Sequence, residues 1–286
     1  MDISKQTLPI LERIADLLEH LQPQITKASD LQKAQAFIWQ AQTRHFLAID
    51  VLRCIDLSLL KDISNIKTPL LENTQRFAQG LPAHNALLWG ARGMGKSSFV
   101  KAVFKEVCQE SEGKLALVEV HREDLADLPE ILVQLTKSPR RFILFCDDLS
   151  FDAGEAVYKS LKVILEGSIA GRPDNVIFYA TSNRRHLMPE TMVDNEQSTA
   201  IHPSEAVEEK VSLSDRFGLW LGFHSCSEAE YLAMVENYAS AYKLDLAKDT
   251  LHQEAKAWAM LRGARSGRVA WQYIIDLAGR KGCSIE

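Results

Sequence analysis

Cysteine clusters, long apolar runs and an excess of basic residues are all missing from this sequence of 286 residues. Its five cysteines are odd in number and widely spaced, which argues against a disulfide framework and a zinc site. No apolar stretch approaches the roughly 18 residues of a membrane-spanning helix. The formal net charge of −5 argues against a wholly basic nucleic-acid module. Since the N-terminus also lacks a signal-peptide profile, we expect a cytoplasmic protein without a membrane segment.

Composition and patterning divide the chain into three parts. Hydrophobic residues make up 46% and charged residues 25%, as in ordinary globular proteins. We expect an N-terminal helical region over residues 1–65, an α/β core over residues 66–225 and a C-terminal helical part over residues 226–286. A chain of this length buries a sizeable core without disulfides or metals.

The N-terminal part has apolar residues at helical spacing. An amphipathic helix is predicted over residues 8–21, ending before Pro23. A second helix is predicted from about Leu31, capped by Ser29 or Asp30. Its apolar residues are Phe37, Ile38, Trp39, Phe46, Leu47 and Val51. These helices either pack on one another or offer a surface to a partner.

Short apolar runs alternate with helical stretches through the core. The runs are Ala86–Trp89, Leu115–Val120, Phe142–Cys146, Val176–Ala180 and Leu219–Phe223. Continuous apolar runs of this length are typical of parallel strands that helices cover on both faces. Beyond them, Ser227 and Glu230 form a capping box, and further helices are predicted over residues 250–262 and 267–280.

A glycine-rich segment follows the first of these strands and fits the pattern G-x-x-x-x-G-K-[ST]. It consists of Gly90, Ala91, Arg92, Gly93, Met94, Gly95, Lys96 and Ser97, and Ser98 continues into a helix. Glycines let backbone N–H groups converge on phosphate oxygens. The lysine reaches the β- and γ-phosphates, and the Ser97 hydroxyl is a ligand for Mg²⁺. The pattern therefore predicts a nucleotide phosphate-binding loop.

Two further strands end in polar residues. Asp147 and Asp148 follow the strand Phe142–Cys146, and adjacent acids at a buried strand end favour a cation. Asp147 is the candidate for orienting Mg²⁺, and Asp148 for polarising the attacking water. Asn183 follows the next strand and is a candidate for orienting that water against the γ-phosphate.

These ordered motifs, together with Asp215-Arg216-Phe217 and Gly267-Arg268, resemble the AAA+ ATPases from about Leu70 to the C-terminus. More closely, the chain resembles a bacterial AAA+ family catalogued as a domain of unknown function. The resemblance implies a P-loop NTPase core with a C-terminal helical lid. It also implies Lys96 and Ser97 as Walker A residues, Asp147 as the Walker B metal residue and Asn183 as sensor 1.

The resemblance further implies roles for arginines. Arg216 corresponds to the finger offered to a neighbouring subunit's nucleotide, and Arg268 to sensor 2, with Arg265 as the alternative. One departure concerns Asp148, because the usual residue after the Walker B aspartate is glutamate. The shorter side chain predicts slow turnover.

Taken together, the sequence predicts ATP binding and hydrolysis with Mg²⁺, coupled to conformational change in a homo-oligomer, either a ring or a nucleotide-dependent assembly. Adenine would be recognised near the linker from Leu60 to Ile66. The expected substrate is an unknown protein partner. Two alternatives stay open, a DNA-associated loader or initiator and a nucleotide-switched scaffold with little turnover. The acidic charge does not favour nucleic acid, although Arg184, Arg185 and His186 form a small basic cluster.

Overall fold

A seven-stranded sheet forms the centre of the protein. The structure is a computed structural model, and it describes residues 30–60, 64–151, 161, 164–165, 173–185, 187 and 214–285. The strand order is β2-β1-β4-β5-β6-β3-β7, and only β2 runs antiparallel to its neighbour. The strands are β1 (Ala36–Gln40), β2 (His45–Ile49), β3 (Ala86–Gly90), β4 (Leu115–Glu119), β5 (Arg141–Cys146), β6 (Val176–Ser182) and β7 (Leu219–Phe223). The five strands predicted from apolar runs are confirmed.

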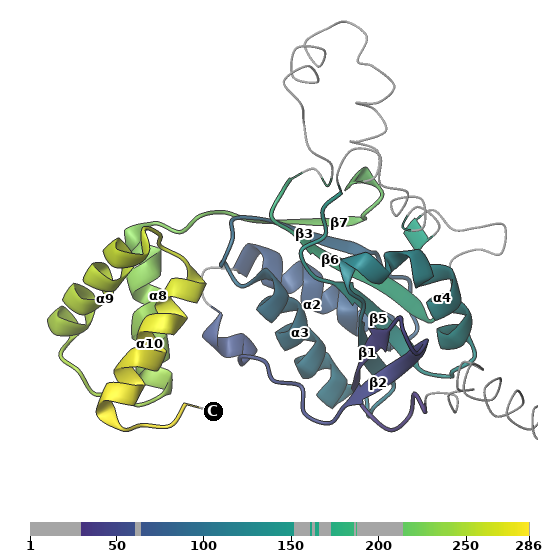
Figure 1. Ribbon diagram of the computed structural model, residues 1–286, viewed down its shortest axis with the longest axis horizontal. Helices are drawn as coiled ribbons and strands as arrows, with labels where there is room; N and C mark the ends of the chain where they lie inside the picture. Colours follow the sequence, from purple (N-terminus) through teal and green to yellow (C-terminus); the bar gives the residue numbers. More distant parts are fainter. Residues whose placement is uncertain are drawn as a thin grey trace, which may run out of the picture.

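Helices cover both faces of the sheet (Figure 1). On one face lie α2 (Ser64–Ala78) and α3 (Lys96–Glu110), whose buried residues Leu70, Phe99 and Val103 share a core with β3 and β6. On the other face lie the 3₁₀ helix η2 (Arg122–Asp127) and α4 (Leu128–Thr136). This burial on two faces explains why β5 and β6 are apolar almost throughout.

The predicted helix from about Leu31 is wrong, because the chain forms the β1–β2 hairpin there. The two strands pair antiparallel, with Trp39 opposite Phe46, and β1 also pairs in parallel with β4. Trp39 and Phe46 are buried against the α4 face, where their ring centroids lie 5.0 Å apart. The hairpin thus extends the sheet. The predicted helix over residues 8–21 lies outside the described residues.

The lid consists of α8 (Glu228–Ala241), α9 (Lys248–Arg262) and α10 (Gly267–Lys281), which lie beside the sheet layers in Figure 1. The predicted capping box at Ser227 and Glu230 is confirmed. Buried Tyr231, Ala255 and Ile274 give the three helices a core of their own. None of the helices that the structure describes combines the length and apolar character needed to cross a bilayer.

The lid touches the rest of the protein through residues 55–59 as well as through the glycine-rich loop. The 3₁₀ helix η1 (Leu57–Leu59) lies between α3 and α8. The side-chain amide of Asn237 donates to the Leu59 carbonyl at 3.1 Å, and Ile55 and Leu59 pack against the lid core. Residues 55–59 therefore form one wall of the space between the core and the lid.

Candidate functional site: the phosphate loop and its carboxylates

The glycine-rich segment is a tight loop between β3 and α3. Gly90, Gly93 and Gly95 have φ angles of 126°, 75° and 85°, a region that favours glycine. A Cβ added to Gly90 would lie 2.0 Å from the carbonyl oxygen of Phe223, so the loop passes directly against β7. The Ala91 N–H donates to the same oxygen at 2.7 Å. The chain thus forms a tight loop. The backbone N–H groups that follow the loop belong to the first turn of α3.

Lys96 is buried at the base of this loop, at 7% exposure. Its ammonium donates to the carbonyls of Gly90 and Ala91, both at 2.9 Å, and to Asn183 Oδ1 at 3.0 Å. Burial lowers the pKa of Lys96, while the charges of Asp148 and Asp147 oppose that shift. The lysine is therefore held in place by the loop itself, with a charge that an anion would stabilise.

The carboxylate of Asp147 meets the loop at the start of α3. Its Oδ1 accepts hydrogen bonds from Ser97 Oγ at 2.5 Å and from the Thr181 hydroxyl. A hydroxyl and a carboxylate in contact supply the hard oxygen ligands that Mg²⁺ prefers, with phosphate and water completing its shell. The described residues hold no group of three or more His, Cys, Asp or Glu that could bind a metal alone.

Asp148 has an unusual backbone, with φ at 51° in the left-handed region. Its N–H donates to Thr181 Oγ1 at 2.9 Å, and its carboxylate accepts from the Asn183 amide. Asn183 therefore contacts both Lys96 and Asp148. The sequence motifs did not identify the role of Thr181, whose hydroxyl contacts both Asp147 and Asp148. Its position at the end of the strand next to β5 was the signal that could have identified it.

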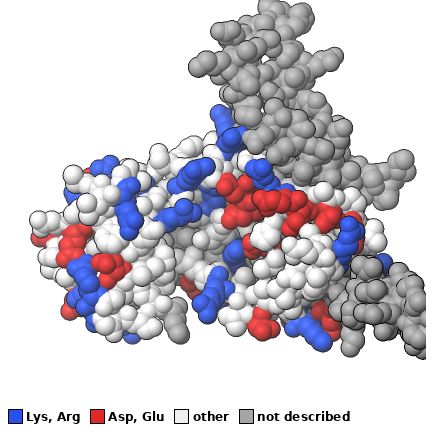
Figure 2. All heavy atoms as spheres, viewed as in Figure 1, with Lys and Arg blue, Asp and Glu red and all other residues white. Residues whose placement is uncertain are grey.

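A cavity of about 1560 Å³ opens from this loop to the linker and the lid. Its lining includes the loop residues from Arg92 to Ser98, both acids and Asn183. Gly90 and Ala91 contribute through their carbonyls beneath Lys96. Apolar residues line the far end, among them Leu59, Leu60, Ile66, Met234 and Trp271. Figure 2 shows basic side chains gathered around the hollow between lid and core, beside an acidic band on the core.

The two candidate lid arginines are placed differently. Arg268 lines the cavity, and its charge lies near enough to Lys96 to lower that pKa. Arg265 instead forms an ion pair with Glu228, at 3.0 Å, within the lid. Of the two arginines, Arg268 therefore lies at the cavity, whereas Arg265 is paired with Glu228.

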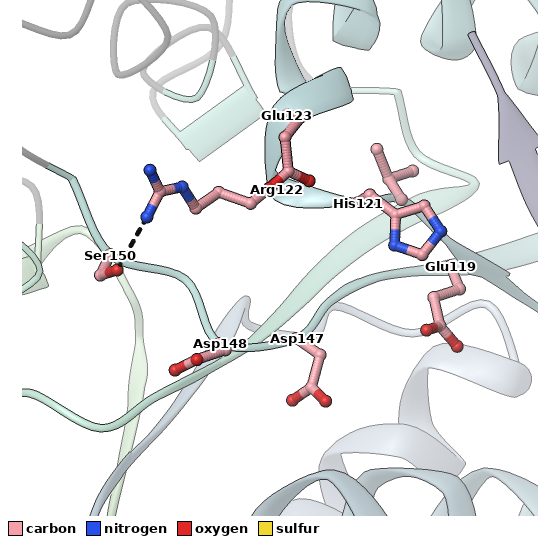
Figure 3. A pocket seen from close by; sticks show the side chains of 8 residues that line it. Glu119, His121, Arg122, Glu123, Asp147, Asp148 and Ser150 are labelled. Carbon is pink, nitrogen blue, oxygen red and sulfur yellow. Dashed lines mark hydrogen bonds between the residues drawn. The ribbon is translucent and has the colours of Figure 1, made fainter.

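A smaller cavity of about 210 Å³ lies beside the two acids (Figure 3). Glu119, His121 and Glu123 line it from the end of β4 and the start of η2, and Arg122 reaches across to Ser150 Oγ at 3.2 Å. The sequence motifs did not single out these residues. Glu119 and Glu123 line the same cavity as Asp147 and Asp148, because β4 and β5 are neighbours and their carboxyl ends meet at one edge.

Arg216 lies outside the lining of both cavities. It is half-buried in the turn before β7, between buried Ser214 and buried Phe217. The Phe217 N–H donates to the Ser214 carbonyl at 3.1 Å, which closes that turn. The predicted loop residues, the two acids, Asn183 and Arg268 thus lie together around the larger cavity. Arg216 and Arg265 lie apart from it.

A family model described as "Protein of unknown function (DUF815)" matches residues 32–281. The chain belongs to this family. The matched range includes the β1–β2 hairpin of this DUF815 chain, the sheet and the lid. Among curated proteins, none matches it.

Solved structures share the fold of the DUF815 chain at low sequence identity. DnaA from Aquifex aeolicus, bound to AMPPCP, is 14% identical with a TM-score of 0.51, over 79% of this chain and 66% of DnaA. Orc1 from Aeropyrum pernix, in complex with DNA, is 13% identical with a TM-score of 0.52, over 79% of this chain and 65% of Orc1. A RuvB mutant from Thermotoga maritima is 16% identical with a TM-score of 0.49, over 80% and 73% of the two chains. The fold is therefore the one seen in DnaA and Orc1, which is the AAA+ α/β fold expected from the sequence.

Proposed function

We propose that this protein binds ATP with Mg²⁺ and hydrolyses it, coupling the reaction to movement of the lid. The observation that carries the proposal is the convergence of Lys96, Asp147, Asp148 and Asn183 at one loop. Among the described residues, the Lys96 ammonium contacts two backbone carbonyls and the Asn183 amide oxygen but no carboxylate, so a bound triphosphate would stabilise its charge. AMPPCP in the DnaA structure supports a nucleotide for this fold.

Each residue has a distinct part in the proposed reaction. Lys96 meets the β- and γ-phosphates, and backbone N–H groups of the loop and the α3 N-terminus bind phosphate oxygens. Ser97 and Asp147 would hold Mg²⁺, whose charge would offset that of the phosphates. Asp148 accepts the proton of the attacking water, and Asn183 orients that water. Since aspartate is shorter than glutamate, we expect slow turnover.

Arg268 extends the proposed site into the lid, and Arg216 extends it to a second subunit. Arg268 approaches the phosphates from the lid side of the cavity. Arg216 lies away from its own cavity, which suits a residue that serves the nucleotide of a neighbouring copy. An arginine stabilises the charge that develops on the transferred phosphoryl group. We therefore propose a nucleotide-dependent homo-oligomer that acts on a protein partner.

A nucleotide-switched scaffold is the second candidate. The Asp148 carboxylate is engaged by Asn183 and sits on a left-handed backbone, which limits its reach toward water. A DNA-associated role is less favoured, because the guanidinium of Arg185 lies over Trp89 and Trp220. Turnover stimulated by DNA, by an unfolded protein or by neither would separate the three functions.

Calorimetric titration with ATP and Mg²⁺ tests the nucleotide site itself. Lys96→Ala should weaken binding about tenfold or more, because it removes the charge opposite the phosphates. Lys101→Ala is the matched control, since Lys101 lies on the same helix and pairs with Glu119 at 3.1 Å. Equal affinity of wild type and Lys96→Ala would contradict the proposal.

A further inference from the structure

The turn at Asn183–Arg185 connects the carboxylate site to the strand that follows Arg216. Asn183 faces the site, where it contacts Lys96 and Asp148. Two residues later the chain has reversed direction, and the Arg185 side chain lies on the α4 face of the sheet. Ser182 Oγ accepts from the Arg184 N–H at 3.2 Å, which fixes the reversal between them.

The Arg185 guanidinium lies over two tryptophans. Its Cζ is 5.3 Å from the ring centroid of Trp89 and 5.8 Å from that of Trp220, within the range of a cation–π contact. Trp89 immediately precedes Gly90 at the start of the phosphate loop, and Trp220 lies in β7. From the turn after β6, one side chain therefore contacts both β3 and β7.

Glycine makes room for this arrangement. Trp89 pairs in register with Gly222 of β7, and a Cβ at Gly222 would lie 3.0 Å from Trp89 Cζ2. The two indole centroids are 6.1 Å apart, and Trp89 also meets His224 edge-on at 5.9 Å. The Trp89 ring is thus held across β7, where Arg185 can lie over both indoles.

A second contact reaches the turn of Arg216 from its other side. The Leu187 N–H donates to Ser214 Oγ at 3.4 Å, and the Leu187 carbonyl accepts from the Phe151 N–H at 2.9 Å. Ser214 and Trp220 lie before and after Arg216 in the chain. Residues just beyond Asn183 therefore contact both ends of the segment that carries Arg216.

We propose that Arg185 is a positioning residue that couples Asn183 to the turn of Arg216. A change at Asn183, when the γ-phosphate is bound or lost, would shift Arg185 against Trp89 and Trp220 and thereby move Arg216. The inference rests on the proposed function, because it gives Arg216 a response to the nucleotide of its own subunit. Such coupling needs a chain of physical contacts, which these residues supply.

Arg185→Gln tests the proposal, with Arg184→Gln as the matched control in the same turn. Arg185→Gln should bind ATP with wild-type affinity but lose about tenfold in kcat, since misplaced catalytic groups slow the reaction without weakening binding. Arg185→Lys keeps a cation and should recover part of that loss. Arg184→Gln should retain wild-type kcat. Wild-type kcat in Arg185→Gln, or an equal loss in the control, would overturn the proposal.

A double-mutant cycle with Arg216→Ala separates coupling from a general structural effect. If Arg185 acts through Arg216, the double variant should have the kcat of Arg216→Ala alone. Additive losses would contradict the coupling.

A binding readout keeps the inference distinct from the proposed hydrolysis. The readout uses a Trp271→Phe background, because the Trp271 indole lines the cavity and would report bound nucleotide directly. AMPPCP should change the tryptophan fluorescence of this background, and the change should be lost when Arg185→Gln is added. A background protein that shows the change without hydrolysing ATP would refute the proposed turnover and leave the coupling in place. Binding of AMPPCP with the same fluorescence change with and without Arg185→Gln would refute the coupling and leave the nucleotide site in place.

Discussion

The backbone N–H of Arg268 donates a hydrogen bond of 2.9 Å to the carbonyl oxygen of Gly93. This bond joins the first turn of α10 to the tip of the phosphate loop. Met94, the next loop residue, packs against both the core of the sheet and the core of the lid. The lid is therefore attached to the loop that we propose binds phosphate, and we expect a change in the loop to move the lid.

Gly93→Ala should disturb this attachment. At Gly93, with φ of 75°, an added Cβ would lie 2.9 Å from Ser266 Oγ and 3.2 Å from the Cβ of Arg268. We expect weaker ATP binding and a lower melting temperature. Gly113→Ala is the control, because Gly113 has a similar φ of 77° but nothing within 4 Å of the added Cβ. Both variants bear a backbone cost of about 1–2 kcal/mol, so only the excess in Gly93→Ala reports on the lid. Identical losses of stability and unchanged ATP affinity would contradict the attachment.

The two adjacent acids should fail in different ways. Asp147→Ala removes the carboxylate beside Ser97, so ATP binding should lose its dependence on Mg²⁺. Asp148→Asn should bind ATP normally and lose turnover, because an amide cannot accept the proton of water. Titrations with Mg²⁺ and with EDTA measure the first effect, and single-turnover hydrolysis measures the second. Asp148→Asn with wild-type turnover would exclude Asp148 as the base.

ATP affinity should depend on pH through Lys96. Burial lowers its pKa from the ordinary 10.5. The native protein therefore holds this proton less tightly than the unfolded chain does, and bound phosphate should raise the pKa again. ATP binding should therefore take up protons in alkaline solution. As the pH rises, the affinity for ATP should begin to decline at a pH below 10.5. Calorimetry in buffers of different ionisation enthalpy measures the uptake; Lys96→Ala should show less of it, and equal uptake in both proteins would contradict the assignment.

A buried arginine should be important for stability rather than for activity. Arg140 is 8% exposed, and its guanidinium donates to the carbonyls of Leu31, Ala34 and Leu115. Arg140→Ala leaves those carbonyls without this donor, which should cost about 3 kcal/mol in the free energy of unfolding. Denaturant unfolding measures the loss, with exposed Lys137→Ala as control. A loss below that of the control would mean that water replaces the guanidinium without cost.

The sequence was sufficient for the sheet core and the lid, but not for the hairpin. Strands such as Phe142–Cys146 are recognisable because burial on two faces makes them apolar without a break. The β1–β2 hairpin lacks the glycine or asparagine that usually marks a tight turn, and Arg44 adopts the left-handed φ of 52° there instead. Trp39 and Phe46 then fall at a spacing that also fits a helix.

The loop and its carboxylates could be predicted from local motifs. The contacts that connect them to other segments of the chain could not. Lys96 and Asp147 could be named from spacing, because the carboxyl ends of parallel strands meet at one edge. The contact of Arg185 with Trp89 and Trp220, and that of Arg268 with Gly93, depend on the packing of segments far apart in the chain. No spacing within the sequence specifies them.

The most direct test of the account is release of phosphate from ATP by the purified protein with Mg²⁺, measured beside Lys96→Ala and across protein concentration. Release should be slow, require Mg²⁺, be lost in Lys96→Ala and rise more than linearly with protein concentration. Arg216→Ala should bind ATP yet release little phosphate, and mixing it with Lys96→Ala should restore part of the activity. Release at the same rate from the wild type and from Lys96→Ala would contradict the account.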